Sequence, residues 1–248
     1  MVRCRKGKKF FSYICNRIMK YLQHIITEGD WQGLESALDS MSNMELRRAE
    51  THIRTTILPS LANNDFWDAL LHLINYRRQA FLSGILAIEH LANDGTLDFN
   101  CPEAKQLAQT LQKDSPESNG KIINMSLPLL KTEQQIEGLL DTFCTGGDQS
   151  RVAALLKVES PQTYYALFTT LRRMPEGKQL AKRCAQFIMK HGNDMAYNMA
   201  AIMKAYFGLD ELSARFSLHI EPYELSGLDS GNTTFYHLLT GRRPNVEI

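Results

Sequence analysis

The sequence has no long apolar run. A helix that crosses a membrane needs roughly 18 or more consecutive apolar residues, and no segment approaches that length. In the basic head of the chain, the apolar stretch 10–15 stops at Asn16 and Arg17, so it is shorter than the roughly 7–15 apolar residues at the centre of a secretory signal. We therefore expect a protein without a transmembrane segment that works in the cytoplasm.

Cysteine is sparse and poorly placed for structural chemistry. The five cysteines, Cys4, Cys15, Cys101, Cys144 and Cys184, are odd in number and widely spaced. None belongs to a C-x-x-C pair or lies at zinc-finger spacing from a histidine, which argues against a disulfide scaffold and a structural zinc site. We expect free thiols in a reducing compartment.

Motifs that carry catalysis or bind nucleotides are also missing. No histidine has a glutamate three residues before it, H-E-x-x-H and G-x-S-x-G are absent, and TGGDQS lacks the Lys-Ser/Thr ending of a P-loop. The two most site-like side chains, His72 and Cys144, are better explained as a hydrogen-bonded core histidine and a small apolar residue that closes a helix. The sequence thus predicts no metal and no cofactor and leans away from an enzyme, although a site assembled from distant residues stays open.

What the sequence does contain is helical periodicity. From Met19 onward, apolar residues recur at spacings of three and four in short segments, and capping signals separate them. Ser42, Thr132, Asp148 and Ser160 are expected N-caps, and Pro161 suits the first turn of a helix. The segment DFWDALLHLI is apolar nearly all round, so its helix should be central. We predict an all-α fold of about a dozen helices of roughly 8–16 residues joined by short connections. The segment FSLHIEPYEL alternates weakly, but no partner strand is evident.

Two stretches match without a gap. Residues 29–53 align with 147–171 so that Asp30 lies over Asp148 and Ser42 over Ser160. Each stretch has the pattern of a capped helix, a short turn and a second capped helix. The match favours stacked αα-hairpins in an irregular, α-solenoid-like repeat that offers a concave groove. The alternative is that any two αα-hairpins align this well, because caps and apolar stripes recur in all of them.

The basic head and the polar centre set the expected domain boundaries. Residues 1–20 contain seven Lys or Arg and no acid; since the whole chain has a net charge of +1, residues 21–248 carry −6. We expect residues 1–18 to be a disordered tail or to precede a working start at Met19; a nucleic-acid arm and a membrane-surface anchor are the alternatives. Residues 19–240 would form the helical domain and 241–248 a frayed end. The polar stretch 112–120 either divides the helical domain into lobes 19–111 and 121–240 or is a surface loop.

These features favour a non-enzymatic protein that binds another protein through helix-pair surfaces. Trp31, Tyr164 and Tyr165 are candidate anchors because they begin helices beside turns, with core packing as the alternative.

The second hypothesis is nucleic-acid binding through arginine doublets on stacked helices, helped by the basic tail. Its candidate phosphate ligands are three pairs: Arg47 and Arg48, Arg77 and Arg78, and Arg172 and Arg173. The doublets Lys182-Arg183 and Arg242-Arg243 add further basic charge.

Overall fold

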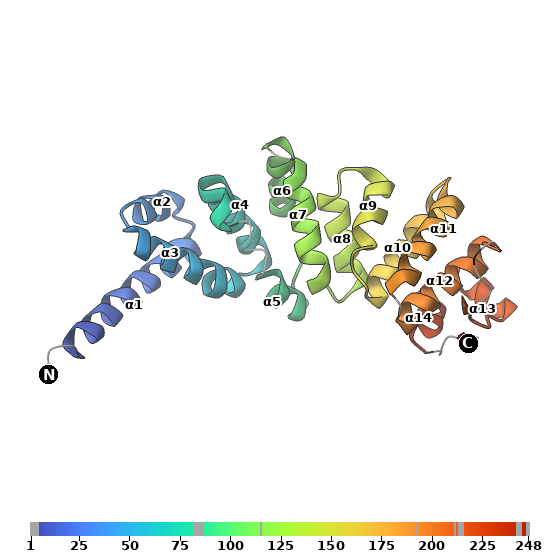
Figure 1. Cartoon of the computed structure of the whole chain (residues 1–248). Helices are drawn as coiled ribbons and strands as arrows, with labels where there is room; N and C mark the ends of the chain where they lie inside the picture. Colours follow the sequence, from blue (N-terminus) through green and yellow to red (C-terminus); the bar gives the residue numbers. More distant parts are fainter. Residues whose placement is uncertain are drawn as a thin grey trace. The chain divides into compact units, whose positions relative to one another are not determined.

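The computed structural model of the chain consists almost entirely of helices (Figure 1). It describes residues 5–81, 87–114, 116–191, 193–210, 212, 216–241 and 245–246. Fourteen α-helices lie in these residues, together with short π and 3-10 turns and two strands of two residues each. The all-α prediction is confirmed. The Arg242-Arg243 doublet lies outside the described residues.

The chain divides into two compact units, Met1–Leu129 and Leu130–Ile248. The polar stretch 112–120 does not separate them. Its residues belong mostly to the helices α6 (Pro102–Asp114) and α7 (Pro116–Ser126) of the first unit. Pro116 begins α7, as expected of a residue whose fixed φ and missing N–H suit the first helical position.

The first unit begins with a long helix and ends with a 3-10 turn. Its remaining elements are α1 (Arg5–Glu28), α2 (Trp31–Asp39), α3 (Asn43–His52), η1 (Ile53–Ile57), η2 (Leu58–Ser60), α4 (Asn63–Phe81), α5 (Ile88–Asn93) and η4 (Leu127–Leu129). Helix α1 packs against α2, α3 and η1, and α6 packs against α4 and α7. Because α1 starts at Arg5, most of the stretch expected to be a tail is helical; the proposed working start at Met19 stays a prediction.

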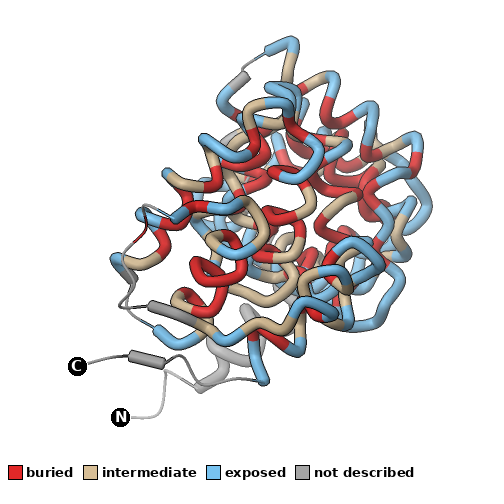
Figure 2. Tube along the Cα trace, turned by 90° about the vertical axis from the view of Figure 1, so that its right-hand side faces the viewer, coloured by how far each residue is buried: buried red, intermediate tan, exposed pale blue. Residues whose placement is uncertain are grey.

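Helix α4 supplies the centre of the first unit, as its nearly continuous apolar sequence predicts. Trp67 is completely buried, with its ring centroid 5.4 Å from that of Phe99. Its indole N–H lies 3.0 Å from the carbonyl oxygen of Asp98 and 3.2 Å from Oδ1 of Asn63. The buried segments of each helix alternate with exposed ones (Figure 2). This is the pattern that an amphipathic helix produces when one stripe faces its neighbours.

The second unit is organised around one helix. Its α-helices are α8 (Glu133–Phe143), α9 (Gly147–Leu155), α10 (Pro161–Arg173), α11 (Gly177–Ile188), α12 (Asp194–Phe207), α13 (Pro222–Gly227) and α14 (Asn232–Thr240), and the 3-10 turn η5 (Met189–His191) follows α11. Helix α10 packs against α8, α9, α11, α12 and α14. Much of α10 is therefore buried, including its side chains Tyr164, Leu167, Phe168 and Leu171.

Two residues of the segment that was expected to be frayed form a short strand. Strand β1 (Phe216–Ser217) pairs antiparallel with β2 (Asn245–Val246), and Phe216 lies opposite Val246. The partner of the weakly alternating segment is thus a pair of residues close to the end of the chain. A partner so distant in sequence leaves no local signal.

The two aligned stretches both form helix pairs, α2–α3 and α9–α10. Asp30 caps α2 by accepting a hydrogen bond from the Gly33 N–H at 3.0 Å, and Ser160 caps α10 by accepting one from the Thr163 N–H at 3.1 Å. The correspondence between Asp30 and Asp148 fails, because Asp148 lies in the first turn of α9 and the N-cap of that helix is Gly146. The helical-repeat relationship stays a prediction.

Candidate protein-binding groove

A groove of about 500 Å³ runs between the first helices of the first unit. It is lined by Ile18 and Tyr21 of α1, by Gly33, Ser36 and Ala37 of α2, by Ser40 and Met41 where α2 ends, and by Glu45 in the first turn of α3. Ser36, Ala37 and Ser40 follow Gly33 at helical spacings, so small side chains form one side of α2. The groove is therefore bounded by small residues on one helix and large apolar ones on the other.

The apolar wall on α1 continues a stripe that begins in the core. Ile18, Tyr21, Leu22 and Ile25 recur at spacings of three and four, which place them on one face of the helix. Leu22 and Ile25 are buried, whereas Tyr21 lines the groove and is 54% exposed. The other helices of the first unit therefore cover only part of this apolar stripe.

Helix α2 is fixed to α4 through residues outside the groove. Trp31 stacks on His72 with ring centroids 4.5 Å apart and the planes 12° from parallel. The Tyr76 hydroxyl donates to the Asp39 carboxylate, and burial together with this hydrogen bond raises the pKa of Tyr76 to about 12. The groove-lining side of α2 is therefore free of these contacts.

The expectation that His72 lies in the core is wrong. Its side chain is 42% exposed, with Nε2 at 3.7 Å from Oδ1 of Asp68. Although its neighbours in sequence are apolar, its helical position directs the ring toward Trp31 at the surface. Cys144 is half-buried and ends α8, in agreement with a helix-closing role.

The three predicted anchors have different environments. Tyr164 is only 1% exposed, so it belongs to the core and is wrong as a surface anchor. Tyr165 is half-buried against Phe235, with ring centroids 5.2 Å apart, and Trp31 is half-buried against His72. Sequence reasoning missed Tyr21; the stripe from Ile18 to Ile25 was the signal that could have identified it.

The two arginine doublets of the first unit differ in their side-chain contacts. Arg47 and Arg48 are exposed on α3. Arg77 Nε lies 2.5 Å from the Glu50 carboxylate, and Arg78 donates to the Ser118 hydroxyl at 2.7 Å. The second doublet is thus held by partners within its own unit.

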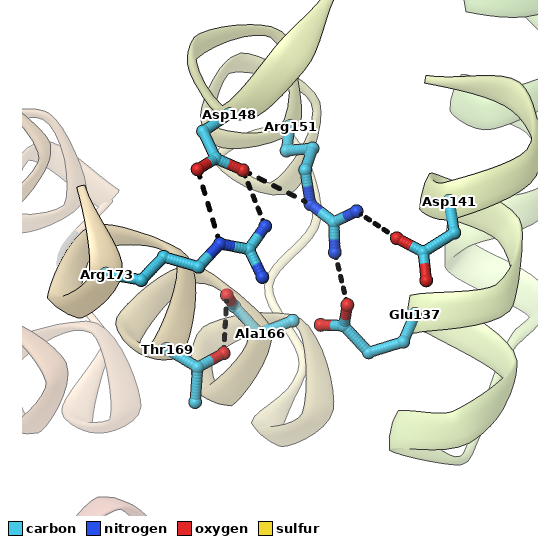
Figure 3. Close-up of polar contacts among 7 residues, drawn as sticks. All are labelled: Glu137, Asp141, Asp148, Arg151, Ala166, Thr169 and Arg173. Carbon is cyan, nitrogen blue, oxygen red and sulfur yellow. Dashed lines mark hydrogen bonds and ion pairs between the residues drawn. The ribbon is translucent and has the colours of Figure 1, made fainter. Parts of the chain in front are cut away.

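In the second unit, both arginines of the predicted doublet also have partners. Arg172 donates to the Leu228 carbonyl oxygen at 2.9 Å and lies 3.4 Å from Oδ1 of Asp229. Arg173 donates twice to the Asp148 carboxylate, at 2.5 and 3.3 Å (Figure 3). Four of the six arginines are therefore occupied within the chain, and phosphate binding by the doublets stays a prediction.

Asp148 belongs to a network that joins three helices (Figure 3). Arg151, whose side chain is only 7% exposed, donates to Asp141 at 2.6 Å and also to Glu137, both on α8. Its Nε lies 4.0 Å from Asp148, which also receives Arg173 of α10. The network links α8, α9 and α10, so it stabilises the packing of these helices.

Asp148 should make the stability of the second unit depend on pH. The hydrogen bond from Arg173 lowers the pKa of Asp148 below its ordinary value. Between the lowered pKa and the ordinary one, the unfolded chain binds a proton that the native state does not, so stability is full above about pH 4 and falls below it. We expect Asp148→Asn to weaken this acid dependence and to destabilise the protein at pH 7 by about 1 kcal/mol or less, since the pair is partly exposed. Urea unfolding at several pH values measures both effects. The exposed Asp94, replaced by asparagine, is the control, and an acid dependence that is as steep in Asp148→Asn as in the unmodified chain would contradict the assignment.

The comparisons with known proteins give no relative: no family model, no curated protein and no solved structure matches the chain. Within the described ranges, no helix is both long and apolar enough to cross a bilayer. The same residues include no group of three or more His, Cys, Asp or Glu side chains able to hold a metal ion. Function is therefore inferred from surface geometry and chemistry.

Proposed function

We propose that this chain is a non-enzymatic binding protein whose groove between α1 and α2 receives an amphipathic helix of another protein. The observation that supports the proposal most directly is Tyr21, which is 54% exposed beside a groove of about 500 Å³. Large aromatic side chains at the edge of a pocket are typical anchors of protein interfaces. Recognition would follow the helix-in-groove mode, in which apolar residues at i, i+3, i+4 and i+7 enter the groove.

The chemistry of the groove favours binding over catalysis. Among the described residues that line it, there is neither histidine nor cysteine. The acid that lines it, Glu45, accepts hydrogen bonds from the Ser42 hydroxyl at 2.6 Å and from the Ser42 N–H at 3.1 Å. These bonds lower the pKa of Glu45, which makes it a poorer proton acceptor. Glu45 thus acts as part of a capping box at the start of α3.

Small residues on α2 are suited to a helical partner. With Gly33, Ala37 and Ser40 on one side of the groove, the backbone of an incoming helix can approach closely. Apolar area removed from water contributes about 25 cal/mol per Å², so covering Tyr21 and Ile18 would supply part of the affinity. Shape and apolar burial would then decide which helix binds.

The free thiols agree with the expectation of a reducing, cytoplasmic setting. Cys101, Cys144 and Cys184 are free. Burial raises the pKa of Cys184 to about 11, so this thiol stays protonated and unreactive at neutral pH. The cytoplasmic location itself is part of the proposal.

Ala37→Arg tests the proposal because it fills the groove. Peptides would be selected from a displayed library of helical sequences against the full chain, and their affinities measured by fluorescence anisotropy. We expect selected peptides to carry apolar residues at i, i+3, i+4 and i+7, and Ala37→Arg to weaken them at least ~10-fold, which corresponds to about 1.4 kcal/mol. Tyr21→Ala should weaken them similarly.

Ala153→Arg is the matched control, because Ala153 is exposed on α9 in the second unit and the substitution is chemically identical. It should leave peptide affinity unchanged. Selected peptides that bind Ala37→Arg as tightly as the unmodified chain would exclude this groove as the binding site.

A further inference from the structure

A second groove lies on the surface of the second unit, along the exposed side of α11. It encloses about 880 Å³. Lys178, Gln179, Lys182, Arg183 and Gln186 line it from α11, and we call these five residues the basic face of α11. Gly208, Leu209 and Asp210, which follow α12, form another wall.

The basic face is what remains exposed when α11 packs into the unit. Ala181, Cys184, Ala185 and Ile188 are buried at spacings of three and four, so they occupy one side of the helix. The opposite side has three cations, and α11 contains no acidic residue. Surface helices commonly mix both signs of charge, so a helix with cations alone creates a local positive potential.

Two of these cations form no ion pair with the described residues. Within the part of the chain that the structure describes, neither the Lys178 ammonium nor the Arg183 guanidinium forms an ion pair. By contrast, Arg172 and Arg173 of α10 both have carboxylate partners. Lys178 lies beside the end of α12, where a side chain at Gly208 would come within 3.7 Å of its Nζ. The groove therefore has, at a concave surface, two cations that form no ion pair with the residues the structure describes.

We propose that the basic face of α11 binds an acidic helical segment of a partner protein. Lys178 and Arg183 both line the groove and lie five residues apart, about 7.5 Å along the helix axis, so carboxylates one to two turns apart on a partner helix can reach both. Gln179 and Gln186 offer amide donors to the same carboxylates. The chemistry is charge-assisted hydrogen bonding, which differs from the apolar contacts proposed for the first unit.

The walls of the groove favour a peptide over nucleic acid. Glu176 and Asp210 also line it. A polyphosphate carries a charge on every residue and would meet repulsion from these carboxylates, whereas an acidic helix can place uncharged residues opposite them. This site is independent of the groove at Tyr21, so the two proposals fail separately.

The test uses the full chain and three kinds of labelled probe in fluorescence anisotropy. The first is a short Ala-rich helical peptide with glutamates at i, i+4 and i+8, and the second is the same peptide with glutamines. The third kind is a pair of oligonucleotides, one single-stranded and one double-stranded. We expect the glutamate peptide to bind, the glutamine peptide to bind at least ~10-fold more weakly, and added salt to weaken binding, since screening acts on exposed charges.

Lys178→Glu combined with Arg183→Glu should weaken the glutamate peptide at least ~10-fold. The neutral variant, Lys178→Gln with Arg183→Gln, should have intermediate affinity. Arg47→Glu combined with Arg48→Glu is the matched control, because these arginines are exposed on α3 of the first unit and the change in charge is the same. It should leave the affinity within ~2-fold, and thermal unfolding checks that every variant folds.

Three results would overturn the proposal. One is no binding of the glutamate peptide, and another is equal binding by the charge-reversed variant. The third is tighter binding of an oligonucleotide than of the peptide, lost in the Lys178/Arg183 variants, which would assign the basic face to nucleic acid.

Discussion

Replacing Gly177 with alanine is expected to destabilise the second unit by about 3 kcal/mol. Gly177 begins α11 and is buried. A Cβ at this position would lie 1.9 Å from the carbonyl oxygen of Leu171 in α10. The obstructing atom belongs to the backbone, so no side-chain rotation relieves the overlap, and α10 and α11 would have to move apart. The position requires glycine because of this close approach.

Gly120→Ala is the control for this effect. Gly120 lies inside α7, where a Cβ would meet nothing within 4 Å. Alanine is favoured over glycine inside a helix, so this variant should be more stable by about 0.5–1 kcal/mol. Urea unfolding followed by far-UV circular dichroism measures both changes in the free energy of unfolding. A Gly177→Ala variant as stable as the unmodified chain would mean that α11 lies farther from α10 than the structure shows.

Gly177→Ala should also affect the proposed binding site for an acidic helix. The basic face is carried by α11, and its position depends on how α11 packs against α10 and α12. If Gly177→Ala shifts α11, affinity for the glutamate peptide should fall along with stability. A peptide affinity that stays constant would indicate that the face tolerates small shifts of its helix.

Trp67→Ala is expected to destabilise the first unit by about 4 kcal/mol. The variant removes a fully buried ring that packs edge-on against Phe66 and lies beside Phe99. It also removes the indole donor to the Asp98 carbonyl oxygen. The cavity lowers stability most, and the lost hydrogen bond adds to it. The loss should therefore be among the largest of any single substitution in this unit.

Tryptophan fluorescence can follow the unfolding of the first unit alone. The chain has two tryptophans, Trp31 and Trp67, and both belong to the first unit. In Trp67→Ala the fluorescence of Trp31 then reports unfolding of the first unit, while circular dichroism reports both units. Trp31→Ala is the matched control; since Trp31 is half-buried, we expect a loss of about 1 kcal/mol. Equal losses in the two variants would contradict the central place of Trp67.

Local signals in the sequence were sufficient for the fold class and for several helix boundaries. Ser42, Thr132 and Ser160 begin helices as predicted, because a cap depends on residues only two or three positions away. The apolar sequence of α4 similarly predicted its burial. Periodicity carries this information because each amphipathic helix must bury one stripe, whatever covers it.

The positions of the functional side chains could not be predicted in this way. Tyr164 and Tyr165 are adjacent in sequence, yet one is fully buried and the other half-buried against α14. Asp148 was expected to cap α9, but it receives Arg173, 25 residues later in the chain. Contacts of this kind depend on which helices become neighbours.

The sequence by itself determined that this chain is helical, where several of its helices begin, and which apolar stripes most of them bury. Only the tertiary structure decided that Tyr21 lines a groove, that four predicted phosphate-binding arginines have partners, and that Lys178 and Arg183 form no ion pair with the residues the structure describes. The physical reason is the separation in sequence over which each interaction acts. Caps and periodicity act within a few residues, whereas exposure and ion pairing are set by side chains brought together from distant parts of the chain.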